Sequence, residues 1–244
     1  MTLLVNPLRR RRGLSFTGIE AAQAVVSRIH RDTGGATPAL RTLEQHHRRW
    51  REGRGDDPAT AKLRLRALDI RCPRDRFSCG DPLVDGWFRE RAWDRHRAGL
   101  CRVVTAHQGD APEPVGFHAL TLAGQPTGLL RQLRRELGME MPGFPAVHLL
   151  HTGVQTSLQG SGIGKILFAD QLARSHLVAA IAGALAVTVI ARARIQPFFA
   201  ALGFRPYDAH GRMLLPMQSL TEAGWASPVG DAQEAGAGAL DREG

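Results

Sequence analysis

A short glycine-rich stretch, Gln159–Lys165, is the part of this sequence that most directly indicates chemistry. Its three glycines stand at alternate positions, and a helix-like pattern follows without a break. The first N–H groups of a helix lack partners within it and mark the positive end of its dipole. Glycines in addition let the backbone come close to a phosphate. The stretch therefore predicts an anion-binding loop made of Gln159, Gly160, Ser161, Gly162, Ile163, Gly164 and Lys165.

Two common phosphate-binding motifs do not fit this loop. The P-loop of nucleotide triphosphatases places Ser or Thr after its Gly-Lys pair, whereas Ile166 follows Lys165 here. The dinucleotide fingerprint G-x-G-x-x-G has another glycine spacing and opens a βαβ unit. A glycine turn with a purely structural role is the alternative to an anion site.

The elements that must position this loop form a mixed α/β pattern. A buried strand precedes the loop, and a long helix follows it. The alternation of apolar residues and the turn signals predict strands at 61–70, 100–108, 115–124, 146–154, 184–191 and 211–220, and further helices at 81–99, 128–138 and 196–204. The order β-α-β-β-α-β-α-β-α-β indicates one sheet flanked by helices.

Both ends of the chain look different from this patterned region. Residues 1–60 form an Arg-rich extension that is either partly helical or disordered, or is upstream sequence from a start codon placed too early. Two short amphipathic helices are expected in it, at Ile19–Arg31 and Pro38–Glu52, followed by a linker at Arg51–Thr60. Thr221–Gly244, rich in Gly, Ala and acidic residues, is expected to be a disordered tail. The predicted domain is thus 61–220.

The net charge of +9 is unevenly distributed. The first 105 residues hold 22 basic and 12 acidic side chains, and the remainder is close to neutral. Such a field could attract nucleic acid or another polyanion. The alternative is coding bias toward arginine, because Lys62 and Lys165 are the only lysines.

The cysteines and the hydropathy argue against metal and membrane sites. Three cysteines at spacings that match no zinc motif predict free thiols in a reducing cytosol and no metal. The longest uncharged apolar run, Leu177–Ala191, is shorter than the roughly 20 residues of a membrane-spanning helix. A cytoplasmic protein with no membrane partner is expected.

Two motifs carry a resemblance to a known family. The segment Gln159–Gly164 resembles the Gln/Arg-x-x-Gly-x-Gly/Ala signature of the GNAT superfamily of N-acetyltransferases, and Phe198–Phe204, "FFAALGF", resembles its closing motif. The resemblance implies the GNAT fold, a mixed and mostly antiparallel sheet, over about residues 61–220. It also implies that acetyl-CoA binds with its pyrophosphate on the loop amides and its pantetheine arm along the backbone of Thr152, Gly153 and Val154.

A narrower resemblance lies upstream. Phe77–Ala92, "FSCGDPLVDGWFRERA", is similar to a segment of the TacT-type toxins of toxin–antitoxin systems. That resemblance implies acetylation of the α-amine of aminoacyl-tRNA, a small ribbon-helix-helix antitoxin as partner, and a homodimer. The alternatives are a GNAT enzyme acting on a small amine or a protein N-terminus, and a catalytically weak module that binds CoA or RNA.

The catalytic groups depart from the family pattern. The strand Ala146–Val154 has no acid to serve as base, which favours an α-amine with a pKa of about 7.7–8.0 over a lysine with a pKa of about 10.4. His151, which stands where the toxins usually carry Arg, or a water could serve instead. Phe199 stands where the family places its Tyr general acid. Water or another group replaces that tyrosine, Tyr207 folds back to the site, or the protein turns over slowly.

Overall fold

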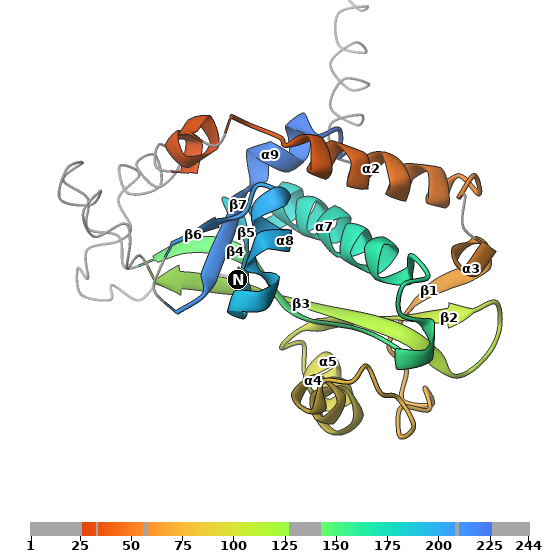
Figure 1. The fold of residues 1–244 in the computed structure, drawn as a ribbon. Helices are drawn as coiled ribbons and strands as arrows, with labels where there is room; N and C mark the ends of the chain where they lie inside the picture. The colour runs from red at the N-terminus through yellow and green to blue at the C-terminus, as the bar shows by residue number, and fades with distance from the viewer. Residues whose placement is uncertain (1–25, 33, 56–57, 127–142, 208–209, 226–244) are drawn as a thin grey trace, which may run out of the picture.

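The structure is a computed structural model that describes residues 26–32, 34–55, 58–126, 143–207 and 210–225. Its centre is a seven-stranded sheet with the strand order β1-β2-β3-β4-β5-β7-β6 (Figure 1). The strands are β1 (Leu63–Ala67), β2 (Arg102–Gln108), β3 (Pro114–Pro126), β4 (Gly143–Val154), β5 (Ala186–Ile190), β6 (Arg205–Pro206) and β7 (Arg212–Pro216).

Neighbouring strands run antiparallel except at the centre of the sheet. β4 and β5 are parallel, since the long helix α7 (Ile163–Ala182) connects them as a crossover. β3 and β4 pair along eleven registered positions and form the longest hairpin of the sheet. This mixed, mostly antiparallel α/β architecture confirms the fold class predicted from the sequence.

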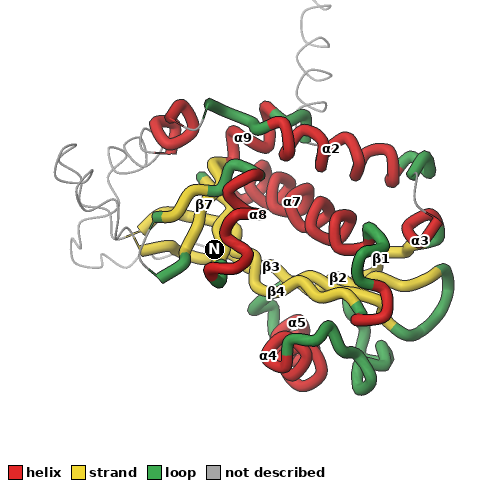
Figure 2. Tube along the Cα trace, viewed as in Figure 1, coloured by secondary structure: helices red, strands yellow, loops and turns green. Residues whose placement is uncertain are grey.

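Helices cover both faces of the sheet. α7 and α2 (Pro38–Arg51) are stacked on one face, and α4 (Pro82–Gly86) and α5 (Ala92–Arg97) lie on the other, as Figure 2 shows. The π-helical turn η1 (Trp87–Arg91) joins α4 to α5, so that the predicted helix at 81–99 is one unit with a π-bulge in its middle. The remaining short elements are α3 (Pro58–Ala61), η2 (Thr156–Leu158), η3 (Ala193–Ile195), α8 (Gln196–Ala201) and α9 (Met217–Glu222).

The sequence explains where α2 begins and which face it buries. Thr37 caps the helix by accepting a hydrogen bond from the Leu40 amide at 3.2 Å, and Pro38 occupies the first turn. Leu40, Leu43 and His47 recur at helical spacing and are buried. Leu40 and Leu43 belong to the same apolar cluster as the inner residues of α7, β5 and β7.

The domain boundary expected at residue 60 therefore does not separate two hydrophobic cores. α2 shares a core with the sheet because its apolar stripe covers α7, although its sequence resembled an extension. The helix expected at Ile19–Arg31 is described only over residues 26–32, and the linker at Arg51–Thr60 contains the start of α3. The helix expected at 128–138 lies outside the described residues.

The C-terminal predictions need two corrections. The strand expected at 211–220 ends at Pro216, which has no amide proton for the ladder, and α9 begins at Met217. The disordered tail expected from residue 221 does not include residues 221–225, since Ala223 and Trp225 are buried against the core, and the rest of it lies outside the described residues. Across the described ranges, no helix is both long and apolar enough to cross a membrane.

Candidate active site

The site begins where β4 and β5 separate. The two strands pair from Ala146↔Ala186 to Leu149↔Val189 and no further. A bulge lies at the same point, because Leu120 of β3 opposes Leu149 while Ala119 opposes His151, which leaves Leu150 as an extra residue. A bulge bends and twists its strand. β4 consequently turns away from β5, and its last residues, 151–154, pair with β3 alone in the described part of the chain.

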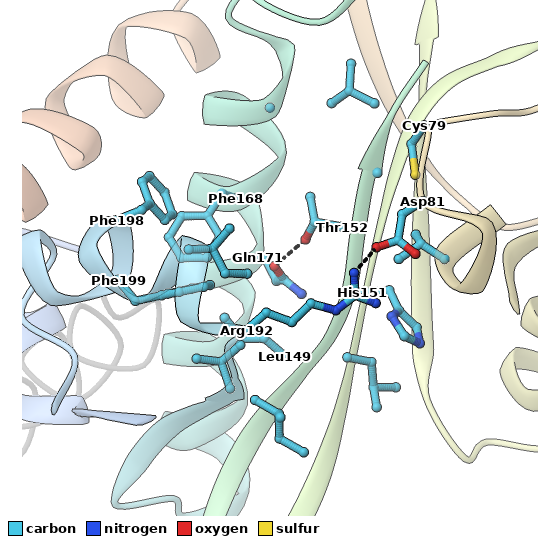
Figure 3. A pocket seen from close by; sticks show the side chains of 18 of the residues that line it. Cys79, Asp81, Leu149, His151, Thr152, Phe168, Gln171, Arg192, Phe198 and Phe199 are labelled. Atoms are coloured by element: carbon cyan, nitrogen blue, oxygen red, sulfur yellow. Dashed lines mark hydrogen bonds and ion pairs between the residues drawn. The ribbon is translucent and has the colours of Figure 1, made fainter. Parts of the chain in front are cut away.

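A pocket of about 780 Å³ fills this split. Its walls come from β4, the glycine loop, the inner side of α7, the segment from β5 to α8, and residues 79–84 before and within α4 (Figure 3). The sheet brings together groups that lie more than 100 residues apart in sequence, such as Asp81 and Arg192.

The glycine loop at one end of the pocket has the form expected of an anion site. Gly160 has φ 83° and Gly162 has φ 80°, a region of backbone conformation that other residues rarely adopt. Gly162 is also the N-cap residue of α7. The amides of Gly160, Gly162, Ile163 and Gly164 have no hydrogen-bond acceptor in the ranges that the structure describes. Four amides at a helix N-terminus can receive a phosphate.

The side chains of the predicted loop residues play different parts. Gln159, Gly160 and Gly164 line the pocket. The Ser161 hydroxyl donates to the Leu158 carbonyl at 2.6 Å, which stabilises the turn itself. Ile163, the first residue of α7, has a fully buried side chain and can offer the site only its backbone amide. Lys165 is exposed outside the pocket lining, and its amide donates to the Gly162 carbonyl at 3.0 Å.

The Phe77–Ala92 segment is tied to this loop. The Gln159 side-chain amide donates to the Cys79 carbonyl at 2.8 Å and to the Val154 carbonyl at 3.2 Å. The Thr156 hydroxyl donates to the Ser78 carbonyl at 2.8 Å. The first residues of the segment are thereby fixed against the loop and the end of β4.

Asp85 explains why this segment needs an acid at that position. Its buried carboxylate accepts hydrogen bonds from the Ser78 hydroxyl at 2.9 Å and the Cys79 amide at 2.7 Å. Phe77 packs edge-on against Phe88 and Phe117 directly beneath. Phe77, Cys79 and Asp85 of the motif thus stabilise the wall of the pocket.

The predicted β4 residues contribute backbone. The Thr152 hydroxyl donates to the Gln171 side-chain oxygen at 3.0 Å, and Gln171 in turn donates to the Ala119 carbonyl at 2.8 Å. Gly153 has no space for a side chain, since a Cβ there would lie 2.9 Å from a ring carbon of Phe117. Thr152, Gly153 and Val154 all line the pocket, in the part of β4 that no longer pairs with β5.

Two histidines of β4 reach the pocket in neutral form. Burial lowers the pKa of His148 and of His151 below the usual 6.5. His148 is paired with the Thr188 hydroxyl at 3.0 Å, so its role is structural. The His151 ring lies 4.6 Å from the Trp87 ring and is half-buried, and at neutral pH it can accept a proton.

The two residues considered for the general acid lie in different places. Phe199 lines the pocket and is packed among Phe168, Phe198 and Phe204. Tyr207 is buried in a separate cluster with Phe144, with ring centroids 6.3 Å apart, and does not line the pocket. The idea that Tyr207 folds back to the site is wrong, because the β6–β7 pairing and the Phe144 contact hold it elsewhere.

Cys79 is not a nucleophile at neutral pH. Burial, together with a hydrogen bond to Asp85, raises the pKa of its thiol to about 11. A thiol that stays protonated favours direct transfer between two bound molecules over an acyl-enzyme.

An ion pair at the pocket wall was not predicted from the sequence. The Arg192 guanidinium donates to the Asp81 carboxylate at 2.7 Å across the split (Figure 3). Asp81 is also the N-cap residue of α4, where its side chain accepts a 3.1 Å hydrogen bond from the Leu83 amide. The ion pair of Asp81 with Arg192 forms because the β5–α8 connection lies next to α4 in the fold, and no local pattern in the sequence indicates that contact.

The chain was compared with known protein families and with solved structures. No protein-family model matches the sequence. Among solved structures, a Tyr-to-Phe mutant of the toxin AtaT bound to the C-terminus of its antitoxin AtaR is similar, with a TM-score of 0.57 at 20% identity over 67% of this chain and 98% of that one. The chain has the GNAT fold.

Two other structures have the same relation to this chain. A Tyr-to-Phe mutant of KacT gives a TM-score of 0.59 at 20% identity, and covers 66% of this chain and 98% of its own. AtaT complexed with acetyl-methionyl-tRNAfMet gives 0.58 at 20% identity, again over 66% and 98%. At this identity the likeness establishes the GNAT fold of the chain.

Proposed function

We propose that this protein is an N-acetyltransferase that moves an acetyl group from acetyl-CoA to a primary amine. One observation carries the proposal: four loop amides at the start of α7, which have no acceptor among the described residues, lie beside the edge of β4 that β5 leaves unpaired. The amides suit a pyrophosphate, and the open strand edge suits an extended arm with amide groups. The pocket between them has the volume of a small-molecule site.

The residues of the chain supply position and proton acceptance. Bound acetyl-CoA would provide an acetyl thioester that an amine can attack directly. Gln159 and Asp85 hold the two walls of the pocket in a fixed relation, so the reacting groups meet without further ordering. His151, neutral and half-buried, is the group of β4 that can take a proton from the amine.

The loop can be tested with a matched pair of glycine substitutions. Gly160→Ala and Gly183→Ala both place a Cβ at positive φ, 83° and 75°, and in both cases that atom meets nothing within 4 Å. Both changes therefore strain the backbone, but Gly183 lies at the far end of α7 from the loop. Gly160→Ala should weaken acetyl-CoA binding roughly 10-fold or more by calorimetry, since it removes the loop shape that aims the amides. Equal binding by both variants and the unaltered protein would count against the site.

The acceptor that we propose is the α-amino group of aminoacyl-tRNA. An α-amine needs little help from a base. This suits β4, which contains no Asp or Glu that could act as one. Arg89, Arg91 and Arg95 on the α4–α5 unit are exposed, and no carboxylate lies within ion-pair distance of them in the described ranges. α2 packs on the opposite face of the sheet and leaves this arginine surface uncovered (Figure 1). Arginines at such a surface suit phosphate contacts.

This choice is supported by the comparison and by a direct assay. The AtaT structure with acetyl-methionyl-tRNA shows that a protein of this fold takes such an acceptor. Charged tRNA, acetyl-CoA and the purified protein should yield acetylated aminoacyl-tRNA. Arg89→Ala combined with Arg91→Ala should raise KM for tRNA and leave KM for acetyl-CoA unchanged. Acetylation of small amines in the absence of any tRNA product would favour the small-amine alternative.

The biological setting belongs to the same proposal. We propose that the protein is a cytoplasmic toxin, active as a homodimer and held in check by a small ribbon-helix-helix antitoxin. The structure of AtaT with AtaR and the structure of a KacTA–DNA complex support a partner of this kind. Co-purification with the product of the neighbouring reading frame would test it.

A further inference from the structure

We propose that Asp81 is the residue that binds the acceptor's ammonium group in the pocket. Before the acceptor binds, the Arg192 guanidinium occupies the same carboxylate. The inference rests on the transferase function proposed above and adds the acceptor subsite to it. It follows from the single carboxylate in the pocket lining, from the fixed position of that carboxylate, and from the small contribution of its ion pair with Arg192.

The charges of the pocket leave one partner for a cation. Among the described residues that line the pocket, Asp81 is the single carboxylate. The titratable groups near it are His151 from β4, Cys79 from the preceding loop, and Arg192 from the β5–α8 connection; an exposed second arginine of that connection, Arg194, also lines the pocket. The histidine and the thiol are neutral at pH 7, and both arginines are cations. A free α-amine, with a pKa of about 7.7–8.0, enters mainly as an ammonium ion and requires an anion.

The carboxylate is held firmly in place. Asp81 caps α4 through the Leu83 amide, and it stands two residues after Cys79, whose carbonyl accepts the Gln159 side chain at 2.8 Å. Its distance from the phosphate loop is therefore fixed by a short, hydrogen-bonded path. Burial acts to raise the pKa of Asp81, but the Leu83 amide and the Arg192 guanidinium outweigh it and hold the pKa below its usual value. The group is an anion when the acceptor binds.

Arg192 is a replaceable partner. Its side chain is 54% exposed, whereas that of Asp81 is 20% exposed, so the guanidinium can move into solvent while the carboxylate stays. Ion pairs with one exposed member contribute little, about 0–1 kcal/mol. An ammonium ion that takes the same oxygen replaces one charge-assisted hydrogen bond with another.

The proton balance of the transfer is complete with these groups. Asp81 holds the ammonium, and one proton leaves to His151 or to water, which gives the neutral amine. Its nitrogen then forms a bond to the acetyl carbon, the carbon–sulfur bond breaks, and the electron pair leaves with sulfur. The amine's second proton is released as the amide forms, one of the two protons ends on the thiolate, and the other enters solvent. The products are the acetylated amine, free CoA thiol and one proton.

The rim of the pocket indicates a suitable probe. Leu83, Ile190 and Phe198 line it and are more than half exposed, so an acceptor with an apolar side chain fits the opening. Leucinamide, an α-amine without a carboxylate, is a small mimic of an aminoacyl ester. N-acetyl-leucinamide, the product of acetyl transfer to leucinamide, has the same side chain and carboxamide but carries an added acetyl group and no positive charge.

The test compares three variants with the unaltered protein. Asp81→Asn keeps a side chain that caps helices as well as Asp does, and removes the charge. Arg192→Gln removes the competing cation. Asp94→Asn makes the same change as the first variant on the same helical unit, at a carboxylate that is 74% exposed and paired with Arg97. Each protein is titrated with both probes in the presence of saturating CoA, and steady-state acetylation of leucinamide is measured alongside.

The inference predicts opposite effects for the two members of the ion pair. Asp81→Asn should weaken leucinamide binding and raise KM about 10- to 100-fold, with binding of N-acetyl-leucinamide and of acetyl-CoA unchanged. Arg192→Gln should strengthen leucinamide binding, and Asp94→Asn should behave as the unaltered protein does. If Asp81→Asn and Arg192→Gln weaken binding equally, the pair is a structural contact and the inference is overturned. If the unaltered protein binds acetyl-CoA but acetylates no amine, the proposed function itself fails, and leucinamide binding still decides on Asp81.

Discussion

The packing of α2 on α7 can be measured through one buried histidine. His47 is 4% exposed and lies between Trp50 and Trp225, with ring centroids 5.7 and 5.5 Å away. Its Nε2 is 4.0 Å from a carboxylate oxygen of Asp170 on α7. Burial outweighs the attraction of Asp170 and lowers the pKa of His47 from 6.5 to about 4. Folding thus makes this side chain harder to protonate.

The sign and size of the effect on stability follow from linkage. Between pH 6.5 and 4 the unfolded chain binds a proton at His47 and the folded protein does not, so the free energy of unfolding falls as the pH falls through this window. For these two pKa values, lowering the pH from 7 to 5 removes about 2 kcal/mol of stability through His47 alone. This is a large share of the roughly 5–15 kcal/mol by which a domain is stable.

Urea unfolding at pH 7 and pH 5 tests the argument. The unaltered protein should lose about 2 kcal/mol more between the two conditions than the His47→Gln variant, since glutamine does not titrate. Taking the difference of the two losses cancels the contribution of the ionisable groups that do not interact with His47. Equal losses would show that His47 titrates freely in the folded protein, and that α2 does not cover α7 in solution.

Two further substitutions test the pocket. Phe199→Tyr should raise kcat at least about 10-fold if a missing general acid limits turnover, because the ring lines the pocket; stopped-flow detection of free CoA would show it, and an unchanged kcat would favour a coenzyme-binding module. Gly153→Ala should destabilise the fold by about 1–3 kcal/mol, since its Cβ would lie 2.9 Å from Phe117 and 3.3 Å from Phe77. Gly124→Ala, with open space on the same hairpin, is the control in thermal unfolding, and similar shifts in both would contradict the packing.

Local signals in the sequence were sufficient for most elements and for the shape of the glycine loop. The strand before the loop, the alternating glycines and the helix after it are all present, because each depends on residues within about one turn of each other. The caps Thr37 and Asp81 with their following prolines mark the starts of α2 and α4 in the same way. The end of the last strand was missed, since the four residues Met217–Leu220 are too few to distinguish the period of a strand from that of a helix.

The tertiary structure alone decided which side chains share the pocket. Asp81 and Arg192 are 111 residues apart, and they meet because β4 bulges at Leu150 and leaves β5. Tyr207, close to the closing motif in sequence, is carried to another cluster by the β6–β7 pairing. Helices, strands and turns arise from contacts between near neighbours, which the order of residues records. The register of a sheet and the packing of α2 on α7 depend on contacts across the whole chain, which no local pattern contains.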